Sequence, residues 1–201
     1  MRLVGSTPMR LAVLASGSGT LLDAMADAGL PIAVVVVDRP CAVEEVAERH
    51  GLRHERVERT DFGAGFDRAR YTDRVLDVLS IERIELVAMA GWGTILAPSA
   101  FAAFPGRIVN THPSLLPSFP GWNAVRDALD YGVKVSGCTV HVATEEVDVG
   151  PILAQEAVEV RADDDEASLH ERIKTVERRL YVDTIRSILD TGSIHETERV
   201  T

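Results

Sequence analysis

The hydrophobic residues of the chain follow two patterns that alternate along the sequence. Short, uninterrupted apolar runs rich in Val, Ile and Leu are typical of strands buried on both faces of a parallel sheet. Between these runs, apolar residues recur every three or four positions, which indicates helices that pack one face against the sheet. The runs predict strands over residues 11–15, 32–37, 54–57, 84–90 and 107–109, and the periodic stretches predict helices over 21–28, 42–50, 66–79 and 97–104.

The C-terminal part of the chain has a different pattern. Residues 136–143 alternate polar and apolar side chains, as in a strand with one polar face, and residues 152–160 can pair with them as a hairpin. Helices are predicted over 122–131 and, after an acidic start at 163–166, along an apolar stripe that reaches Ile188. The whole pattern predicts an α/β, Rossmann-like fold, with a mostly parallel, twisted sheet of about seven strands, helices on both faces and an antiparallel hairpin near the C-terminal edge.

The length of 201 residues suits one domain with one core. Residues 10–190 are predicted to form this domain, with a leader over residues 1–9 and a polar tail over residues 191–201. The leader has no apolar run typical of a signal peptide, and no segment approaches the roughly 20 apolar residues that cross a bilayer. Since Cys41 and Cys138 are the only cysteines, a reducing, cytoplasmic location is expected.

The formal net charge of −10 argues against nucleic acid and anionic membranes as partners, because Lys and Arg form no cluster in the sequence. The two cysteines have no spacing typical of a metal site, and no metal is expected. Small-molecule substrates are therefore the expected partners, and a homodimer is left open. An anionic substrate is compatible with the charge, since loop amides and helix N-termini can bind a phosphate in an acidic protein.

A glycine-rich loop, Ser16-Gly17-Ser18-Gly19-Thr20, follows the first predicted strand and precedes a helix. Glycines let backbone amides approach a ligand, and the helix N-terminus adds partial positive charge, so that a phosphate is the expected ligand. The third glycine of the dinucleotide fingerprint and the Walker lysine are both missing, which argues against NAD and ATP. A tight turn that serves only to reverse the chain explains the loop equally well.

The segment from Arg107 to Pro117 begins as a strand and continues as a loop, because Pro113 and Pro117 prevent a helix. In an extended backbone, Asn110 and His112 point to the same side. An Asn amide can stabilise a developing oxyanion, and a His with its ordinary pKa of about 6.5 can relay protons near neutral pH. The pair therefore predicts chemistry on a carbonyl group. The alternative is an Asn that caps a turn and a His that bonds a loop carbonyl.

Four further positions bear on a possible site. The loop Gly91-Trp92-Gly93-Thr94 follows a strand, at the end where open α/β sheets bind ligands, although its Trp can equally belong to the core. Asp148 lies in an acidic loop after the half-polar strand. His141, within that strand, is interpreted as an ordinary sheet histidine in preference to a partner of the site. Glu177 lies beside the apolar stripe of the last helix, where a solvated, ion-paired Glu is the usual finding.

Taken together, these features resemble the folate-dependent formyltransferases. The resemblance covers almost all of residues 11–189 and rests on two motifs. Within the family, the chain is most similar to the enzymes that formylate 5-phosphoribosylglycinamide in purine (IMP) biosynthesis. The two motifs are Asn110-Thr111-His112-Pro113-Ser114-Leu115-Leu116-Pro117, with Phe119-Pro120-Gly121 after it, and Val147-Asp148-Val149-Gly150-Pro151-Ile152.

The resemblance implies roles for individual residues. Asn110, His112 and Asp148 are implied to be the catalytic set. The ribonucleotide is implied to contact Gly19, Thr20 and Leu21 with its phosphate, Glu177 with its ribose, and Asn110. The folate cosubstrate is implied to contact Trp92, Gly93, Thr94, Ile95, Leu96, Val142 and Asp148, and Arg68 best matches an Arg that flanks the folate in relatives.

The chain departs from the family pattern at two places. Leu21 stands where relatives usually have Asn, so that only its backbone amide can contact the phosphate. The folate loop usually reads Gly-Phe-Met-Arg-Ile-Leu, whereas Gly93 and Thr94 replace the long Met and Arg here. The pterin end of the pocket is therefore expected to be wider than usual.

The implied reaction transfers a formyl group from 10-formyltetrahydrofolate to the primary amine of 5-phosphoribosylglycinamide without a metal. Asn110 and His112 would stabilise the oxyanion, and the Asp148 carboxylate would favour a cationic imidazole and order a relay water. Another formyltransferase, or a formyltetrahydrofolate hydrolase of the same fold, is an alternative. Hydrolases that resemble the family carry a regulatory domain first, and the first predicted strand here begins at Leu11. A non-catalytic sensor of phosphorylated metabolites is the other alternative, and it would need no oxyanion donor.

Overall fold

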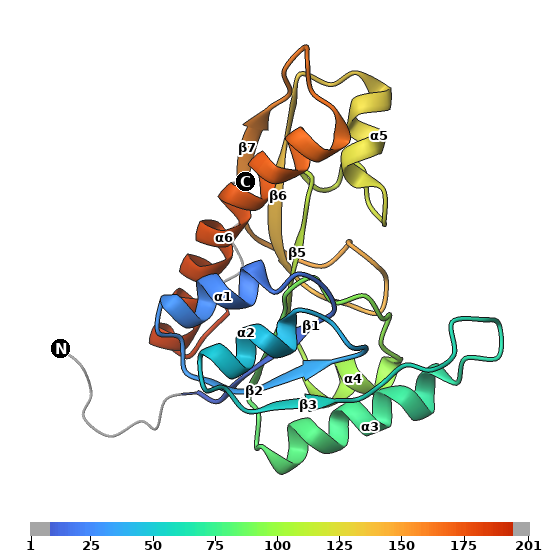
Figure 1. The fold of residues 1–201 in the computed structure, drawn as a ribbon, viewed down its shortest axis with the longest axis vertical. Helices are drawn as coiled ribbons and strands as arrows, with labels where there is room; N and C mark the ends of the chain where they lie inside the picture. Colours follow the sequence, from blue (N-terminus) through green and yellow to red (C-terminus); the bar gives the residue numbers. More distant parts are fainter. Residues whose placement is uncertain (1–8, 195–201) are drawn as a thin grey trace.

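The apolar runs of the sequence form one seven-stranded sheet in the computed structural model, which describes residues 9–194 (Figure 1). The strand order is β3-β2-β1-β4-β5-β6-β7. β1 to β5 pair in parallel, whereas β5, β6 and β7 pair antiparallel, which confirms the predicted mostly parallel sheet with a hairpin at its edge. The strands are β1 (Leu11–Ala15), β2 (Ile32–Val37), β3 (His54–Arg56), β4 (Leu86–Met89), β5 (Ile108–His112), β6 (Val135–Val142) and β7 (Ile152–Glu159). The helices are α1 (Thr20–Asp27), α2 (Val43–Arg49), α3 (Arg68–Ile81), α4 (Pro98–Ala103), α5 (Ala124–Tyr131) and α6 (Glu166–Thr191).

Different helices cover the two faces of the sheet (Figure 1). Side chains of β1 alternate between them: Leu11, Val13 and Ala15 pack with α1, α2 and α6, whereas Ala12 and Leu14 pack with α3 and α4. All five residues of β1 are buried. The uninterrupted apolar run in the sequence is therefore the result of a strand that has no face towards solvent.

The chain changes direction across the sheet between β1 and β4, since β1 leads outwards to β2 and β3, and β4 leads the other way to β5. Open α/β sheets bind ligands in the crevice at the carboxyl ends of strands at such a point. The loops after β1 and β4 meet there. The Gly93 N–H donates to Ser16 Oγ at 2.7 Å, and the Ser16 N–H donates to the Gly91 carbonyl at 3.2 Å.

Several element boundaries differ from the sequence prediction by one to three residues, and two of the differences affect the site. The apolar run predicts a strand end at Val109, but β5 continues to His112 because β6 pairs with its polar residues and extends the ladder. The helical pattern predicts a start at residue 122, but α5 begins at Ala124, so that Trp122 lies in the preceding loop. The sequence pattern misses both because tertiary pairing and packing decide where an element ends.

The two ends of the chain add little to the described fold. Residues 1–8 of the predicted leader and residues 195–201 of the predicted tail are outside the described residues, and Thr191, predicted as the start of the tail, is the last residue of α6. α6 is followed by Gly192, whose φ of +69° is the left-handed conformation that glycine adopts easily after a helix C-terminus. Among the helices that the structure describes, none has the length and apolar character needed to cross a lipid bilayer.

The loop between β6 and β7 folds tightly back onto the end of β6. The Val142 N–H donates to the Pro151 carbonyl at 2.8 Å. Gly150 allows this close approach, because a Cβ atom at this position would overlap with the carbonyl of Val142. The loop that carries Asp148 is therefore tied to the sheet at both ends.

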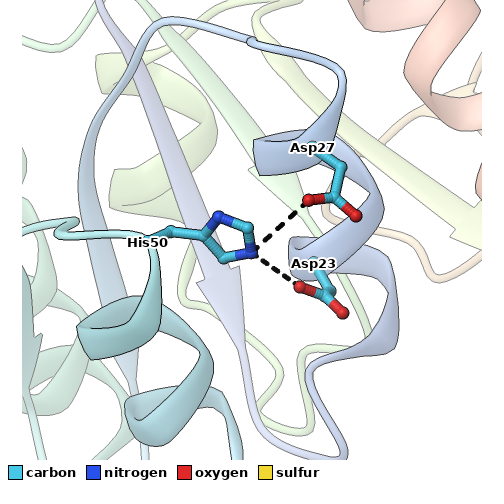
Figure 2. Close-up of side chains that lie close together, drawn as sticks. All are labelled: Asp23, Asp27 and His50. Atoms are coloured by element: carbon cyan, nitrogen blue, oxygen red, sulfur yellow. Dashed lines mark hydrogen bonds and ion pairs between the residues drawn. The ribbon is translucent and has the colours of Figure 1, made fainter.

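A group of charged side chains joins α1 to the end of α2 (Figure 2). His50 Nε2 lies 2.6 Å from Asp23 Oδ1 and 3.8 Å from Asp27 Oδ1, and Arg49 contacts the same Asp23 oxygen at 2.7 Å. The hydrogen bond to His50, and then the one to Arg49, lower the pKa of Asp23. Asp23, Asp27 and His50 also offer ligand atoms of the kind that bind metal ions. The Arg49 guanidinium already neutralises Asp23, so we describe the group as an ion-pair clamp.

Replacing Asp23 by Asn should lower the free energy of unfolding at pH 7 by up to about 1 kcal/mol, because a partly exposed ion pair contributes little more. The pKa of Asp23 is lowered from 3.8 in the folded chain, so its contribution is present above that value and is lost as the pH falls through the folded pKa. Urea unfolding at pH 7 and pH 3 measures this. Asp27→Asn, at the more distant and more exposed carboxylate, is the control and should change stability less.

Replacing Gly150 by Ala should destabilise the fold by about 1–3 kcal/mol or more, because a backbone carbonyl cannot move aside as a flexible side chain can. Thermal unfolding of the variant measures the effect. Gly17→Ala is the matched control, since a Cβ atom there meets nothing within 4 Å. Unchanged stability of Gly150→Ala would contradict the tight return of this loop onto β6.

Candidate active site

A cavity of about 220 Å³ opens at the carboxyl ends of β4 and β5. Its wall is built by β5, by β6 and by three loops, namely the loop after β4, the loop after β5 and the loop between β6 and β7. Asn110, His112 and Asp148 all line this cavity, although Asp148 is distant from the other two in sequence. The geometry therefore gathers these three polar side chains in one place.

β5 positions Asn110 and His112 through its pairing with both neighbouring strands. Asn110 pairs with Met89 of β4 on one side and with His141 of β6 on the other. Because the two residues are two positions apart on a strand, their side chains point to the same face. His112 is only 5% exposed, so its ring is largely withdrawn from solvent.

Both ring nitrogens of His112 face hydrogen-bond acceptors. Nε2 lies 2.8 Å from the Phe119 carbonyl oxygen, and Nδ1 lies 3.3 Å from Asp148 Oδ2. A neutral imidazole can donate to only one of these oxygens, whereas the imidazolium donates to both. Phe119 has a φ of +53°, in a region that non-glycine residues rarely adopt, so the loop after β5 is held in an unusual backbone conformation beside His112. The surroundings are thus arranged for a proton carrier.

Asp148 connects the loop after β5 to the loop after β6. Its Oδ2 accepts a hydrogen bond from the Gly121 N–H at 2.8 Å, and its Oδ1 lies 3.5 Å from His141 Nε2. Burial raises the pKa of Asp148. The hydrogen bonds to His141 and Gly121 and the charge of His112 together lower it by more, so that the net pKa is below the ordinary 3.8. Asp148 is therefore a carboxylate at neutral pH.

His141 lies between Asn110 and Asp148, a position that the sequence interpretation as an ordinary sheet histidine does not anticipate. Its Nδ1 lies 3.0 Å from the Val142 carbonyl oxygen, which can only accept, so Nδ1 carries a proton. Nε2 lies 3.2 Å from the Asn110 amide nitrogen and 3.5 Å from Asp148 Oδ1. His141 thus links the Asn110 amide to the Asp148 carboxylate.

The polar face of β6 is buried and supports the loop after β5. The Thr139 hydroxyl accepts from the Leu116 N–H at 3.0 Å and donates to the Ser114 carbonyl at 2.7 Å. Gln155 of β7 donates to the Leu116 carbonyl at 2.9 Å. The alternation that predicts a half-polar strand thus reflects buried hydrogen bonds to a loop that lines the site.

The glycine loop lies at the start of α1, outside the cavity wall. Gly19 has a φ of +77° and provides no side-chain cap, so that the first N–H groups of α1 are available to an anion. Thr20 is exposed, and its hydroxyl lies 3.4 Å from that of Ser18. Leu21 is buried in the core, which leaves its backbone amide as the group that can contact a ligand.

Glu177 is linked to the cavity through Thr111. The Thr111 hydroxyl donates to Glu177 Oε1 at 3.1 Å, and Thr111 itself lines the cavity. Burial raises the pKa of Glu177 above its ordinary 4.5, and the hydrogen bond from Thr111 only partly offsets this. Glu177 is therefore a half-buried acceptor and not the solvated, ion-paired residue that is usual on such a helix.

The residues expected to bind folate divide into two groups. Five of them line the cavity, and three do not. Gly93 packs behind the cavity wall, Val142 lines a neighbouring hollow, and Arg68 lies exposed at the start of α3. The five that line the cavity are Trp92, Thr94, Ile95, Leu96 and Asp148.

An apolar rim surrounds the mouth of the cavity, and sequence analysis does not identify it. Trp122 is 73% exposed, and Ile95 and Val147 are also exposed although all three line the cavity. Trp122 follows Gly121, whose N–H is bonded to Asp148. Its place directly after the motif Phe119-Pro120-Gly121 is the sequence signal that could have pointed to it.

Comparisons with known proteins agree with this arrangement. The formyl transferase family model matches residues 9–185. A phosphoribosylglycinamide formyltransferase from Mycobacterium tuberculosis is 43% identical over 197 residues, which cover 96% of this chain and 90% of the relative. The crystal structure of glycinamide ribonucleotide transformylase 1 from Symbiobacterium toebii has a TM-score of 0.89 and 38% identity, and the match covers 99% of this chain and 96% of that one.

A solved structure with a different printed activity is also similar. The formyltetrahydrofolate deformylase from Pseudomonas syringae has a TM-score of 0.84 and 25% identity, and the match covers 95% of this chain and 65% of that one. The fold and the extended sequence match therefore point to formyl-group chemistry in general. Because a family model covers most of the chain and the identity to the M. tuberculosis relative is high over nearly its whole length, this chain belongs to the formyl transferase family.

Proposed function

We propose that the protein transfers the formyl group of 10-formyltetrahydrofolate to the amine of 5-phosphoribosylglycinamide. The observation that carries the proposal is the group Asn110, His112 and Asp148 at one side of a cavity whose other walls are largely apolar. The printed names of the M. tuberculosis and S. toebii relatives support this choice of acceptor. The reaction needs an oxyanion donor, a proton carrier and an anchor for each substrate.

Asn110 is the proposed oxyanion donor. The amine attacks the formyl carbon, and negative charge grows on the formyl oxygen while the bond to the folate nitrogen weakens. A preorganised N–H that is already aimed at this oxygen stabilises the charge without reorganisation. The contact of 3.2 Å between the Asn110 amide and His141 Nε2 supports this role, because it fixes how the amide is turned.

His112 and Asp148 are the proposed proton carriers. As the new C–N bond forms and the old one breaks, one proton must leave the attacking nitrogen and one must reach the departing nitrogen. An imidazolium at His112, 3.3 Å from the Asp148 carboxylate, could donate to the developing charge and then exchange the proton. The buried Asp148 carboxylate keeps a negative charge beside the His112 imidazolium during the whole transfer.

The ribonucleotide is proposed to bind between the start of α1 and α6. The available amides at Gly19, Thr20 and Leu21 suit a phosphate, and the acceptor oxygen of Glu177 suits a ribose hydroxyl. Both anchors together would bring the amine of the acceptor to Asn110 as a near neighbour of the formyl carbon. Leu21 in place of the usual Asn leaves the main-chain part of this phosphate site intact.

The residues of the cavity fit a flat heteroaromatic ring. The walls offer the side chains of Trp92, Ile95 and Leu96, and Trp122 lies at the mouth. Trp92 Nε1 is buried and has no hydrogen-bond partner within residues 9–194. 10-Formyltetrahydrofolate would supply the activated formyl group there.

Hydrolysis of the same formyl donor is the second candidate, because the similarity to the P. syringae deformylase favours it specifically. Water can replace the amine as the attacking group beside Asn110 and His112. A hydrolase has no need of a phosphate site at α1 or of a ribose acceptor at Glu177, and both features favour transfer. A non-catalytic sensor would need neither Asn110 nor His112 in this arrangement.

Tetrahydrofolate release, followed spectroscopically, should be rapid only when 5-phosphoribosylglycinamide is present. Asn110→Ala is the matched control, and its turnover should fall about 10²-fold or more because a preorganised donor is lost. Equal release with and without the acceptor would identify a hydrolase. No release under either condition would overturn the proposed reaction.

Glu177→Ala should raise the KM for the ribonucleotide about tenfold or more while leaving the KM for the folate within about twofold, because a charged hydrogen-bond acceptor for the ribose is lost. Steady-state kinetics with each substrate varied in turn measures both constants. Glu171→Ala, on the exposed face of the same helix, is the control. Equal effects of Glu177→Ala on both substrates would argue against a ribose contact.

A further inference from the structure

A buried carboxylate supports the loop after β4 from behind. Asp38, at the end of β2, has no exposed surface. The Arg39 guanidinium donates to both of its oxygens at 2.9 Å, and the Thr94 hydroxyl donates to Oδ2 at 2.7 Å. Burial raises the pKa of Asp38. The hydrogen bonds from Arg39 and Thr94, and the Ser16 hydroxyl, together lower it by more, so that the group is a carboxylate at neutral pH.

The same network holds the backbone of this loop. Ser16 Oγ accepts from the Gly93 N–H at 2.7 Å, and Ser16 also lowers the pKa of Asp38. Residues on either side of Gly93 form part of the cavity wall, since Trp92 and Thr94 line it. The position of this wall therefore depends on groups directly after β1 and β2 that do not themselves line the cavity.

Gly93 and Arg39 occupy adjoining space. A Cβ atom at position 93 would lie 2.9 Å from an Arg39 guanidinium nitrogen and 3.4 Å from Ser16 Oγ. The first distance is too short unless Arg39 moves, and a moved Arg39 would lose its two hydrogen bonds to Asp38. Once Arg39 is absent, the remaining contact, with Ser16 Oγ at 3.4 Å, is an ordinary van der Waals contact. A side chain at 93 and a guanidinium at 39 are therefore alternatives for one volume.

We propose that Asp38 and Arg39 are positioning residues for the part of the active site that binds the formyl donor. In this proposal, Arg39 and Gly93 form a matched pair that sets the shape of the cavity wall made by the loop after β4. The inference rests on the proposed function in taking a folate as the ligand of the cavity. It adds that the loop at positions 93 and 94 is supported by the segment after β2, through an arginine behind the wall and a carboxylate that accepts from the Thr94 hydroxyl.

The test is a double-mutant cycle with Arg39→Ala, Gly93→Ala and the variant that carries both. Binding of a folate analogue is measured by isothermal calorimetry, and KM for each substrate and kcat are measured where turnover is present. Each single substitution should weaken analogue binding and raise the folate KM about tenfold, since misplacing a wall of a site costs up to about 10²-fold. The ribonucleotide KM and kcat should change less than about twofold.

The double variant distinguishes the outcomes. If the pair shares one volume, the double variant should bind the analogue about as well as either single variant, because Gly93→Ala has no effect once Arg39 is gone. Arg59→Ala is the matched control: this guanidinium lies over the Phe62 ring at 4.7 Å, as Arg39 does at 5.4 Å, but does not bond to Asp38. It should leave analogue binding within about twofold.

Additive effects of about 100-fold in the double variant would overturn the matched pair. If the single variants lose both kcat and thermal stability while their affinity for the folate analogue is unchanged, the positioning role is overturned and the role of these residues is purely structural. If the unsubstituted protein binds the analogue but shows no acceptor-dependent turnover, the proposed reaction fails while the calorimetric cycle still decides the inference. If it binds no folate analogue at all, the inference fails with the assignment of the cavity.

Discussion

The arrangement of the site depends on one buried carboxylate. Asp148 receives the Gly121 N–H from one loop, faces His112 on β5 and lies beside His141 on β6. These groups come from three different segments of the chain. Because the carboxylate compensates for its burial through them, displacement of any one segment removes one of the partners of a buried charge. The loop after β5, the strand pair β5–β6 and the loop after β6 are therefore stabilised as a unit.

The protein combines an overall acidic charge with a proposed ligand that carries a phosphate. The fold reconciles the two by local means. The available amides at the start of α1 and the positive end of its helix dipole act over a few ångströms, whereas the net charge of −10 is spread over the surface and screened by salt.

The parts of the fold that could be predicted from the sequence are those decided by local pattern. The apolar runs at Leu11–Ala15 and Ile32–Val37 coincide with β1 and β2, because a strand buried on both faces has no other composition available. The catalytic group was predicted from the resemblance of two motifs, and the structure brings those residues into one cavity. Which roles they have remains a prediction.

The parts that could not be predicted depend on contacts between distant segments. His141 reads as an ordinary strand residue until the register of β5 and β6 sets it opposite Asn110. Trp122 reads as the start of a helix, and only the later start of α5 leaves it at the cavity mouth. Likewise, nothing in the neighbourhood of Gly93 in the sequence indicates that Arg39 fills the space beside it. Register, loop packing and volume exclusion are tertiary properties.

The burial of Leu21 has a consequence for how this site can change over evolution. Its side chain belongs to the hydrophobic core, so the groups that it offers to a ligand are those of the main chain. Every residue type except proline has the same main-chain N–H. A point mutation at this position to any residue other than proline can therefore alter the stability of the helix, but it keeps the hydrogen-bond donor. An inhibitor whose anionic group is held by these amides would thus keep that contact when side chains at this position are substituted. The cavity wall at Trp92 and Thr94 is built from side chains, so substitutions there can produce resistance.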